Sequence, residues 1–237
     1  MWPTHDDAGW IEAAMAIKLW GRYTSGRTLK VLWALGELEL DFELVLASGA
    51  MGPDGAVSKG HTPYGVVDQA DYLAMNPNGR VPTIDDDGFV LWESNSIVRY
   101  LGMQYGPEHF YGNSVQMFAS ASRWLDFENN NLVPSMHEID VQIRRTPEPD
   151  RDPAKVERAT KTLIAEFNKV EHQLGETRFM CGDHWTMGDI GIGLRVHRWH
   201  MFALPGAPEW PNIGRYYAEI LARPAFDAVS DRRYHAG

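Results

Sequence analysis

The first hundred positions of the chain switch between strand-like and helix-like spacing of apolar residues. Residues 17–23 predict a short strand, and the chain breaks at Thr24-Ser25-Gly26 before a helix that runs to about Leu38. Residues 42–46 predict a second strand. The apolar face of the helix, with spacings of four and three, consists of Val31, Leu35 and Leu38.

Residues 81–92 carry the pattern of a β-hairpin. Two apolar runs flank Asp87-Gly88, a dipeptide suited to the positive φ values of a tight turn. Ser94 then stands where it caps a helix to about Tyr105. Residues 48–63 are rich in Gly, Pro, Ser and Ala and predict an irregular surface loop. This order of elements predicts a small α/β unit.

Every strong pattern after Gly112 is helical. Asp152-Pro153 supplies the cap and first-position proline of a long helix that Gly175 is expected to end. Thr186 and Asp189 have the spacing of a variant capping box for another helix. Two predicted helices precede this capping box, and each has an apolar face. The first face consists of Phe118, Ala121, Leu125 and Leu132, and the face of the long helix consists of Val156, Ala159, Leu163, Phe167, Val170 and Leu174.

Three glycines lie in the helix that follows the predicted capping box: Gly188, Gly191 and Gly193. Each costs up to about 1 kcal/mol relative to alanine in a helix interior. We therefore expect this helix to pack closely against another helix.

Composition narrows the class of protein. A chain of 237 residues, 44% hydrophobic and 23% charged, has room for two small soluble domains. The formal net charge of -10 disfavours a nucleic-acid partner, although a local basic patch can still hold one small anion. Cys181 is the single cysteine, so no intramolecular disulfide or cysteine-rich metal site is possible, and we expect a buried thiol in a reducing compartment.

Membrane and metal sites are not predicted. No apolar run approaches about 18 residues, and the N-terminus lacks the basic start and apolar core of a signal peptide, so we expect a cytoplasmic protein. The run Asp85-Asp86-Asp87 is typical of a solvated turn rather than of a calcium site. His197 and His200 are three residues apart, but spacing supplies no third ligand.

Three local motifs, in this order, resemble the cytosolic glutathione S-transferase family, in particular its bacterial, serine-type, theta-like members. Residues 76–82 (NPNGRVP) and 91–97 (LWESNSI) are similar to the family's glutathione-site signature. Gly182-Asp183 with residues 186–190 is similar to its second-domain capping motif. The resemblance implies a thioredoxin-like domain over residues 17–105 and an all-α domain over 113–232.

The chemistry of such a protein requires an ionised thiol. A thiol with a pKa near ~8.5 is only slightly ionised at neutral pH, so a hydroxyl and a helix N-terminus must stabilise the thiolate. Ser25 lies where the first strand gives way to a helix, and in the resembling serine-type members the active serine precedes a helical valine by six residues, as Ser25 precedes Val31. Helix capping is the alternative role of Ser25, and Thr24 and Tyr23 are the rival hydroxyls.

Glutathione binding is the second implication of the resemblance. A cis Val81–Pro82 bond would hold the cysteinyl part, and Ser94 with Glu93 would bind the carboxylate and ammonium of the γ-glutamyl end. Arg80 would reach the glycyl carboxylate or face solvent. Lys59 and His61, in the unusual 48–70 segment, are unaligned candidates for the same carboxylate.

The acceptor is expected to be a small hydrophobic electrophile, bound between the domains. Candidate wall residues are Trp124 and the stretch from Arg195 to Phe202, which includes Trp199; core packing is the alternative for each. The predicted function is glutathione transfer, with glutathione-dependent ether cleavage, dehalogenation or isomerisation, or a non-catalytic binding module, as alternatives. The resemblance also implies a homodimer.

Overall fold

The computed structural model describes residues 17–48, 66–204, 206–227 and 229–230. Within them, a four-stranded mixed sheet has the order β2-β1-β3-β4. Strands β1 (Ile17–Gly21) and β2 (Phe42–Leu46) are parallel, whereas β3 (Thr83–Asp86) is antiparallel to both β1 and β4 (Phe89–Trp92). The chain reversal between β3 and β4 has positive φ values at Asp87 and Gly88, as the hairpin pattern predicted.

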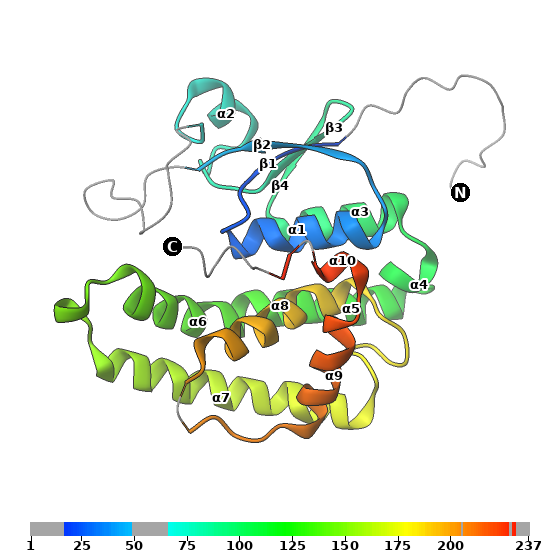
Figure 1. Ribbon diagram of the computed structural model, residues 1–237. Helices are drawn as coiled ribbons and strands as arrows, with labels where there is room; N and C mark the ends of the chain where they lie inside the picture. The colour runs from blue at the N-terminus through cyan, green and yellow to red at the C-terminus, as the bar shows by residue number, and fades with distance from the viewer. Residues whose placement is uncertain (1–16, 49–65, 205, 228, 231–237) are drawn as a thin grey trace.

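Helices cover both faces of this sheet (Figure 1). Helices α1 (Gly26–Glu37) and α3 (Ser94–Tyr105) lie on the face turned toward the rest of the chain, and α2 (Ala70–Met75) lies on the other face. The order β1-α1-β2-α2-β3-β4-α3 is a thioredoxin-like domain. The sequence pattern missed α2, which has only six residues and no side-chain cap.

The remainder of the chain is helical, as predicted. Its elements in chain order are α4 (Glu108–Tyr111), α5 (Val115–Phe127), the π-helical turn η1 (Glu128–Leu132), α6 (Val133–Asp140), the π-helical turn η2 (Val141–Arg145), the 3₁₀ turn η3 (Glu148–Asp150), α7 (Pro153–Glu176), α8 (Met187–Phe202), α9 (Pro211–Leu221) and α10 (Pro224–Asp227). Asp152 caps α7, but the helix continues one residue past the predicted end at Gly175.

Helix α8 is the central helix of this region. Thr186 and Asp189 form the predicted capping box at its N-terminus. A Cβ atom at Gly188 would lie 2.9 Å from the Ala121 carbonyl oxygen, and one at Gly193 would lie 2.8 Å from the Trp33 ring. The expected close helix packing is therefore confirmed, and it joins α8 to α5 and to α1.

One apolar core extends through both parts of the chain. Trp33 of α1 is fully buried, and its ring centroid lies 4.9 Å from that of Trp185 and 4.7 Å from that of Phe226. The thioredoxin-like domain is thus fixed against the helices, so that a site at their junction has defined walls.

The aspartates of the hairpin serve the fold. An Asp85 oxygen accepts a hydrogen bond from the Gly88 N–H at 2.7 Å, and Asp86 accepts bonds from the Tyr100 and Tyr105 hydroxyls, both at 2.6 Å. No group of three or more metal-ligating side chains occurs in the described ranges. No helix there has both the length and the apolar character needed to cross a membrane. The loop expected over 48–63 lies outside the described residues apart from Ser48.

Candidate functional site

The register of the sheet brings the predicted site segments to one edge. Trp20 of β1 pairs with Thr83 of β3, and Thr83 pairs in turn with Trp92 of β4. The residues after β1, before β3 and after β4 therefore leave the sheet at the same end. These three segments carry Ser25, Val81-Pro82 and Glu93-Ser94.

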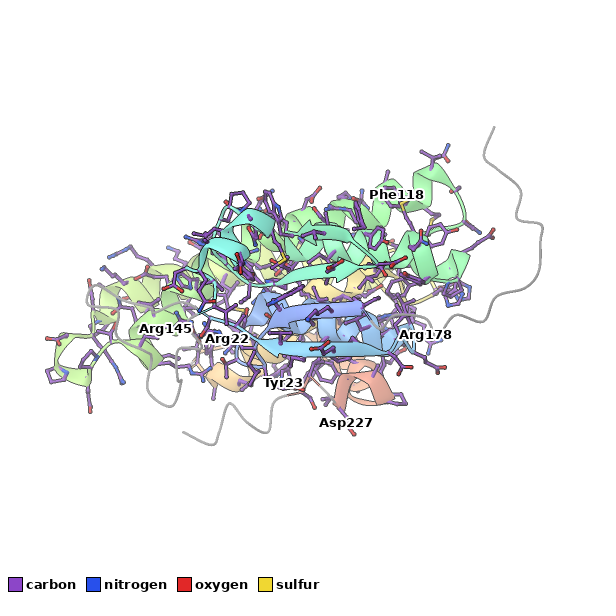
Figure 2. The ribbon with its side chains drawn as sticks, turned by 90° about the horizontal axis from the view of Figure 1, so that it is seen from above. Arg22, Tyr23, Phe118, Arg145, Arg178 and Asp227 are labelled. Carbon is purple, nitrogen blue, oxygen red and sulfur yellow. The ribbon has the colours of Figure 1, made fainter. Side chains whose placement is uncertain are left out.

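Figure 2 looks down on the sheet and shows Arg22 and Tyr23 at this end, on the same side as Arg145, with Arg178 at the opposite end. Tyr23 and Thr24, the rival hydroxyls, lie in the half-buried turn between β1 and α1.

Ser25 is the N-cap of α1. Its backbone is extended, and its Oγ accepts a hydrogen bond from the Thr28 N–H at 3.3 Å. The side chain is half-buried. A hydroxyl that accepts one bond still has its own proton to donate, so capping leaves Ser25 able to bind an anion at the positive end of the helix.

The Val81–Pro82 bond is cis, as the resemblance implied. The preceding carbonyl of Arg80 accepts hydrogen bonds from the Tyr72 hydroxyl at 2.8 Å and from Asn76 Nδ2 at 2.7 Å, which fixes this segment, while the Arg80 side chain is exposed. Within the described residues, the Val81 N–H and C=O have no hydrogen-bonding partner. These groups can pair with an extended peptide laid along the segment.

Glu93 and Ser94 form the junction between β4 and α3. Glu93 is exposed and has φ 71° and ψ 110°, a conformation that a non-glycine residue adopts at a cost of about 1–3 kcal/mol. Ser94 is 1% exposed, and its hydroxyl has no hydrogen-bonding partner in the described part of the chain. An unpartnered buried hydroxyl at a helix N-terminus is a group that a bound carboxylate would satisfy.

Lys30, Glu128 and Arg195 form a buried ionic cluster that was not predicted from the sequence. Glu128 accepts a hydrogen bond from Lys30 Nζ at 2.9 Å and from Arg195 Nε at 2.6 Å, and the Lys30 and Glu128 side chains are fully buried. The cluster joins α1, η1 and α8. A signal for it existed, because Glu128 stands three residues after Leu125 and four before Leu132, on the predicted apolar face.

Burial and charge set the pKa values in this cluster. Burial acts to raise the pKa of Glu128, but the adjacent Lys30 and Arg195 charges outweigh it and lower the pKa to about 2. Burial lowers the pKa of Lys30 to about 8, even though Glu128 favours the charged form. At neutral pH, Glu128 is therefore ionised and Lys30 is mainly protonated.

Asn95 connects the ionic cluster to the end of the sheet that carries the site. Its Oδ1 accepts a hydrogen bond from Lys30 at 2.6 Å, and its Nδ2 donates to the Leu125 carbonyl at 2.6 Å. Since Asn95 directly follows Ser94, these bonds hold the N-terminus of α3 against α1 and α5.

The two tryptophans predicted for the acceptor pocket pack within the helical region. Trp199 is 5% exposed, and its ring contacts those of Phe167 and Trp210, at centroid distances of 5.5 Å and 5.4 Å. Trp124 is 8% exposed and contacts Phe127 edge-on. These contacts fit the packing alternative, and a contact with an acceptor stays a prediction for both.

The predicted stretch does supply wall residues for a small hollow beside Gly26, at the start of α1. Its lining, from α1, α8 and the chain beyond α10, comprises Gly26, Leu29, Leu194, Arg195, His197, Arg198, Met201 and Val229. His197 Nδ1 shares a 2.8 Å hydrogen bond with the Tyr217 hydroxyl. Burial raises the pKa of the half-buried Cys181 thiol to about 11, so this cysteine stays protonated at neutral pH.

The fold defines a class of proteins in which a thioredoxin-like domain is followed by a helical domain. A family model for the N-terminal domain of glutathione S-transferases matches residues 24–104. Glutathione S-transferase GstB of Escherichia coli strain K12 is 36% identical over 215 residues, which cover 90% of this chain and 97% of the relative. The chain therefore belongs to the glutathione S-transferase family.

Solved structures agree with this assignment. A theta-class glutathione S-transferase from the citrus canker pathogen Xanthomonas axonopodis pv. citri, crystallised with glutathione bound, has a TM-score of 0.78 and 32% identity, covering 90% of this chain and 95% of that chain. Poplar glutathione transferase F1, at 22% identity and a TM-score of 0.76, shares the fold; the match covers 93% of this chain and 99% of that one.

Proposed function

We propose that this chain is a glutathione transferase that holds glutathione along the edge formed by Val81-Pro82, Glu93-Ser94 and Ser25. The observation that carries the proposal is the unpartnered, buried hydroxyl of Ser94. The α-carboxylate of a γ-glutamyl group would accept a hydrogen bond from it and from backbone N–H groups of α3. The adjacent, exposed Glu93 would pair with the α-ammonium group.

The cysteinyl part of glutathione would then pair with the backbone of Val81, as an added strand pairs with a sheet edge. Because the register places the N-terminus of α1 at the same end of the sheet, the thiol of a tripeptide anchored in this way would lie near Ser25. The Ser25 hydroxyl would donate a hydrogen bond to the sulfur and favour the thiolate. Arg80 remains a proposed contact for the glycyl carboxylate.

The reaction proposed is nucleophilic attack by this thiolate on an electrophilic carbon of a small, mainly apolar acceptor. The C–S bond forms, and the leaving group departs with its bonding electrons. Ser25 would contribute by raising the fraction of ionised thiol at neutral pH, and a pKa two units lower corresponds to about 2.7 kcal/mol. Thr24 is the alternative hydroxyl.

Calorimetry with glutathione tests the binding proposal. The wild-type chain is expected to bind glutathione, and Ser94→Ala is expected to weaken binding about tenfold through the lost charge-assisted hydrogen bond. Ser96→Ala, on the same helix, is the control and should bind like wild type. Absence of binding by the wild-type chain, or equal binding by Ser94→Ala, contradicts the proposal.

An activity assay distinguishes an enzyme from a non-catalytic binding module. With 1-chloro-2,4-dinitrobenzene as acceptor, we expect catalysed formation of the thioether that depends on Ser25. Glutathione binding without any catalysed reaction of this or another electrophile would favour the non-catalytic module.

A homodimer in the cytoplasm completes the proposal, on the resemblance described above. Phe89 of β4 is 49% exposed, with its ring 4.9 Å from that of Tyr100 of α3, and offers apolar surface for such a contact. Sedimentation should show a dimer that Phe89→Ser weakens. A monomeric wild-type chain would contradict this part.

A further inference from the structure

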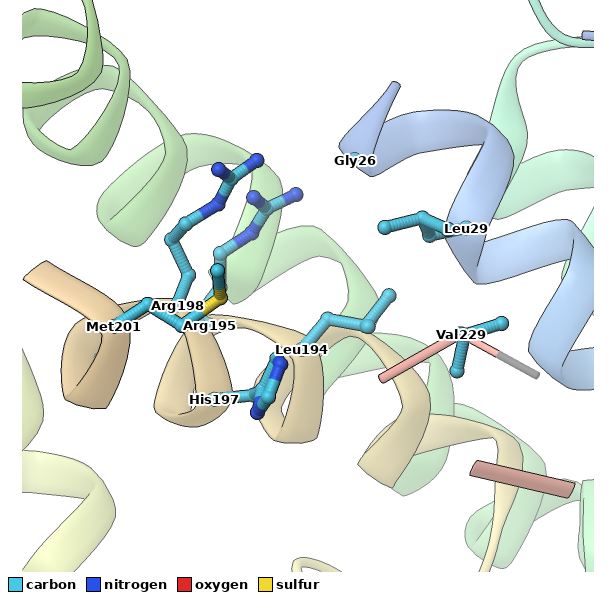
Figure 3. A pocket seen from close by; sticks show the side chains of 8 residues that line it. All are labelled: Gly26, Leu29, Leu194, Arg195, His197, Arg198, Met201 and Val229. Carbon is cyan, nitrogen blue, oxygen red and sulfur yellow. The ribbon is translucent and has the colours of Figure 1, made fainter. Parts of the chain in front are cut away.

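Two arginine side chains from α8 lie beside the N-terminus of α1, where the thiol is proposed to bind. Figure 3 shows Arg195 and Arg198 extending from adjacent turns of α8 in the same direction, toward Gly26. A Cβ atom at Gly26 would be 3.3 Å from Arg195 Nη1 and 3.9 Å from Arg198 Nη2. Both guanidinium groups therefore approach the residue that follows Ser25.

Arg195 is a nearly buried cation, and only part of its guanidinium group makes hydrogen bonds. Its side chain is 9% exposed, and its Nε donates to Glu128 at 2.6 Å. In the described ranges of the chain, neither Nη1 nor Nη2 has a hydrogen-bonding partner. These donors are available to a ligand that accepts hydrogen bonds from them.

Two carboxylates next to the hollow each contact more than one cation. The Asp140 carboxylate lies 3.4 Å from Arg198 Nη1, 3.2 Å from Arg145 Nε and 3.5 Å from Arg144 Nη1. Three arginines therefore contact this carboxylate. Glu128 likewise pairs with two cations, Lys30 and Arg195. Two guanidinium groups thus lie close to the N-terminus of α1. They would attract a small anion there although the formal net charge of the chain is -10.

The lining of the hollow also has an apolar part. Leu29, Leu194 and Met201 lie beside the arginines, and Leu29 and Leu194 are both 5% exposed. An acceptor bound next to these walls would place an apolar body against them and an anionic group beside the arginines.

We propose that Arg195 and Arg198 form an anion subsite for the acceptor, so that the preferred electrophiles carry a carboxylate, or a group of similar charge and shape, next to an apolar body. This inference rests on the proposed function, because it concerns the second substrate of the same site. It changes the expected acceptor from a purely hydrophobic electrophile to an anionic one.

The physical reason concerns repulsion between two anions. A thiolate and a carboxylate-bearing acceptor repel each other in a poorly hydrated cleft, which slows their encounter. Arginine guanidinium groups beside Gly26 would offset this repulsion and orient the acceptor through paired N–H groups. A neutral acceptor can still accept hydrogen bonds from the same groups, but it lacks the charge–charge attraction.

A matched pair of acceptors tests the proposal. 4-Chloro-3-nitrobenzoate and 4-chloro-3-nitrobenzamide have the same shape, and in both the glutathione thiolate forms a C–S bond while chloride leaves with the electron pair of the C–Cl bond. We measure kcat/KM at saturating glutathione and divide each value by the rate constant of the uncatalysed reaction. The expected wild-type preference for the benzoate is at least about tenfold, the size of one charge-assisted hydrogen bond.

Three variants test which residues cause the preference for the benzoate over the benzamide. Arg198→Gln and Arg195→Lys should each bring the benzoate preference close to one, the latter because lysine keeps the charge beside Glu128 but lacks the planar fork. Arg178→Gln is the control, since Arg178 pairs with Glu219 on the surface at the far end of the molecule (Figure 2). It should keep the wild-type preference. The proposal is overturned if the wild type prefers the benzoate by less than about twofold. It is also overturned if Arg198→Gln and Arg195→Lys both keep the wild-type preference.

Binding of the two glutathione conjugates, measured by calorimetry, gives a decision that does not depend on turnover. Tighter binding of the carboxylate conjugate by wild type, lost in Arg198→Gln, supports the subsite. Equal binding of both conjugates overturns it while leaving the proposed function intact. Failure of glutathione and both conjugates to bind overturns both. Weakened binding of glutathione itself by Arg198→Gln would assign the arginines to glutathione and not to the acceptor.

Discussion

Ser25 Oγ accepts a hydrogen bond from the Thr28 backbone N–H at 3.3 Å, so the residue proposed to bind the thiol is also the cap of α1. The two roles suggested by the sequence are therefore compatible. Capping uses the oxygen as an acceptor, and thiolate binding uses the hydroxyl proton as a donor. The cap also fixes the side chain at the positive end of a 12-residue helix.

The ionic cluster should make a large contribution to stability. Glu128→Gln leaves Lys30 and Arg195 buried without their counter-charge, and we expect the free energy of unfolding to fall by about 3–5 kcal/mol. Glu43→Gln, which removes a 63% exposed acid that lies 3.8 Å from Lys18, should change it by less than about 1 kcal/mol. Chemical denaturation measures both, and a similar small loss in the two variants would contradict the importance of the cluster.

The same cluster predicts a pH dependence. The pKa of Glu128 is about 2 in the folded chain, against an ordinary value of 4.5, so between these values the unfolded state binds a proton that the folded state does not. The stabilisation is complete above pH 4.5 and is lost as the pH falls toward 2. One such proton corresponds to a slope of at most about 1.4 kcal/mol per pH unit.

The difference in unfolding free energy between wild type and Glu128→Gln should therefore shrink as the pH falls below about 4.5. Denaturation curves at several acidic pH values give this difference. A difference that stays constant down to pH ~2.5 would show that the pKa of Glu128 is not depressed.

Close packing between the two domains depends on Gly193. A Cβ atom there would lie 2.8 Å from Trp33 and 2.9 Å from Ile220, so Gly193→Ala is expected to cost about 1–3 kcal/mol. Gly214 is a matched control in α9, because a Cβ atom there meets nothing within 4 Å. Gly214→Ala should stabilise the chain by about 0.5–1 kcal/mol. Thermal unfolding that ranks the two variants in the opposite order would contradict the packing described.

Strain at Glu93 predicts a trade-off between stability and binding. Glu93→Gly should relieve the positive φ of 71° and raise the free energy of unfolding by about 1 kcal/mol, while it removes the partner proposed for the glutathione ammonium group. Glu93→Gln keeps the strained backbone and loses the charge. We expect both variants to bind glutathione more weakly in calorimetry, and only the glycine variant to melt at a higher temperature.

Ala203→Gly provides the matched test of strain alone, since Ala203 at the end of α8 also has a positive φ, 47°. It should stabilise the chain and leave glutathione binding unchanged. Unchanged binding in both Glu93 variants would remove Glu93 from the site.

The elements that the sequence predicted correctly are those fixed by local chemistry. The hairpin follows from Asp87-Gly88, and the start of α8 follows from Thr186 with Asp189. Helix α2 was missed because it has six residues, and its N-cap, Gln69, makes no side-chain bond to the helix. The apolar periodicity also gave no sign of the π-helical turns, which keep the same face buried.

The site was predictable only where a motif specified it. The hydroxyl and acidic residues of the proposed glutathione edge lie in contiguous segments, so the family resemblance of these segments identified Ser25, Glu93 and Ser94 as candidates. Arg195 was named as part of the candidate acceptor wall, but its ion pair could not be found in this way, because its partner Glu128 is 67 residues away and α8 is buried on nearly all sides. A helix buried all round has no polar face against which an arginine would stand out.

Ionisation of bound glutathione tests the central claim most directly. The ultraviolet absorbance of the thiolate is titrated from pH 5 to 9 with saturating glutathione on the wild type, Ser25→Ala and Thr24→Ala. We expect a bound-thiol pKa about two units below the ordinary ~8.5 in the wild type and in Thr24→Ala, and a value near ~8.5 in Ser25→Ala. A depressed pKa that persists in Ser25→Ala would contradict the role given to this serine.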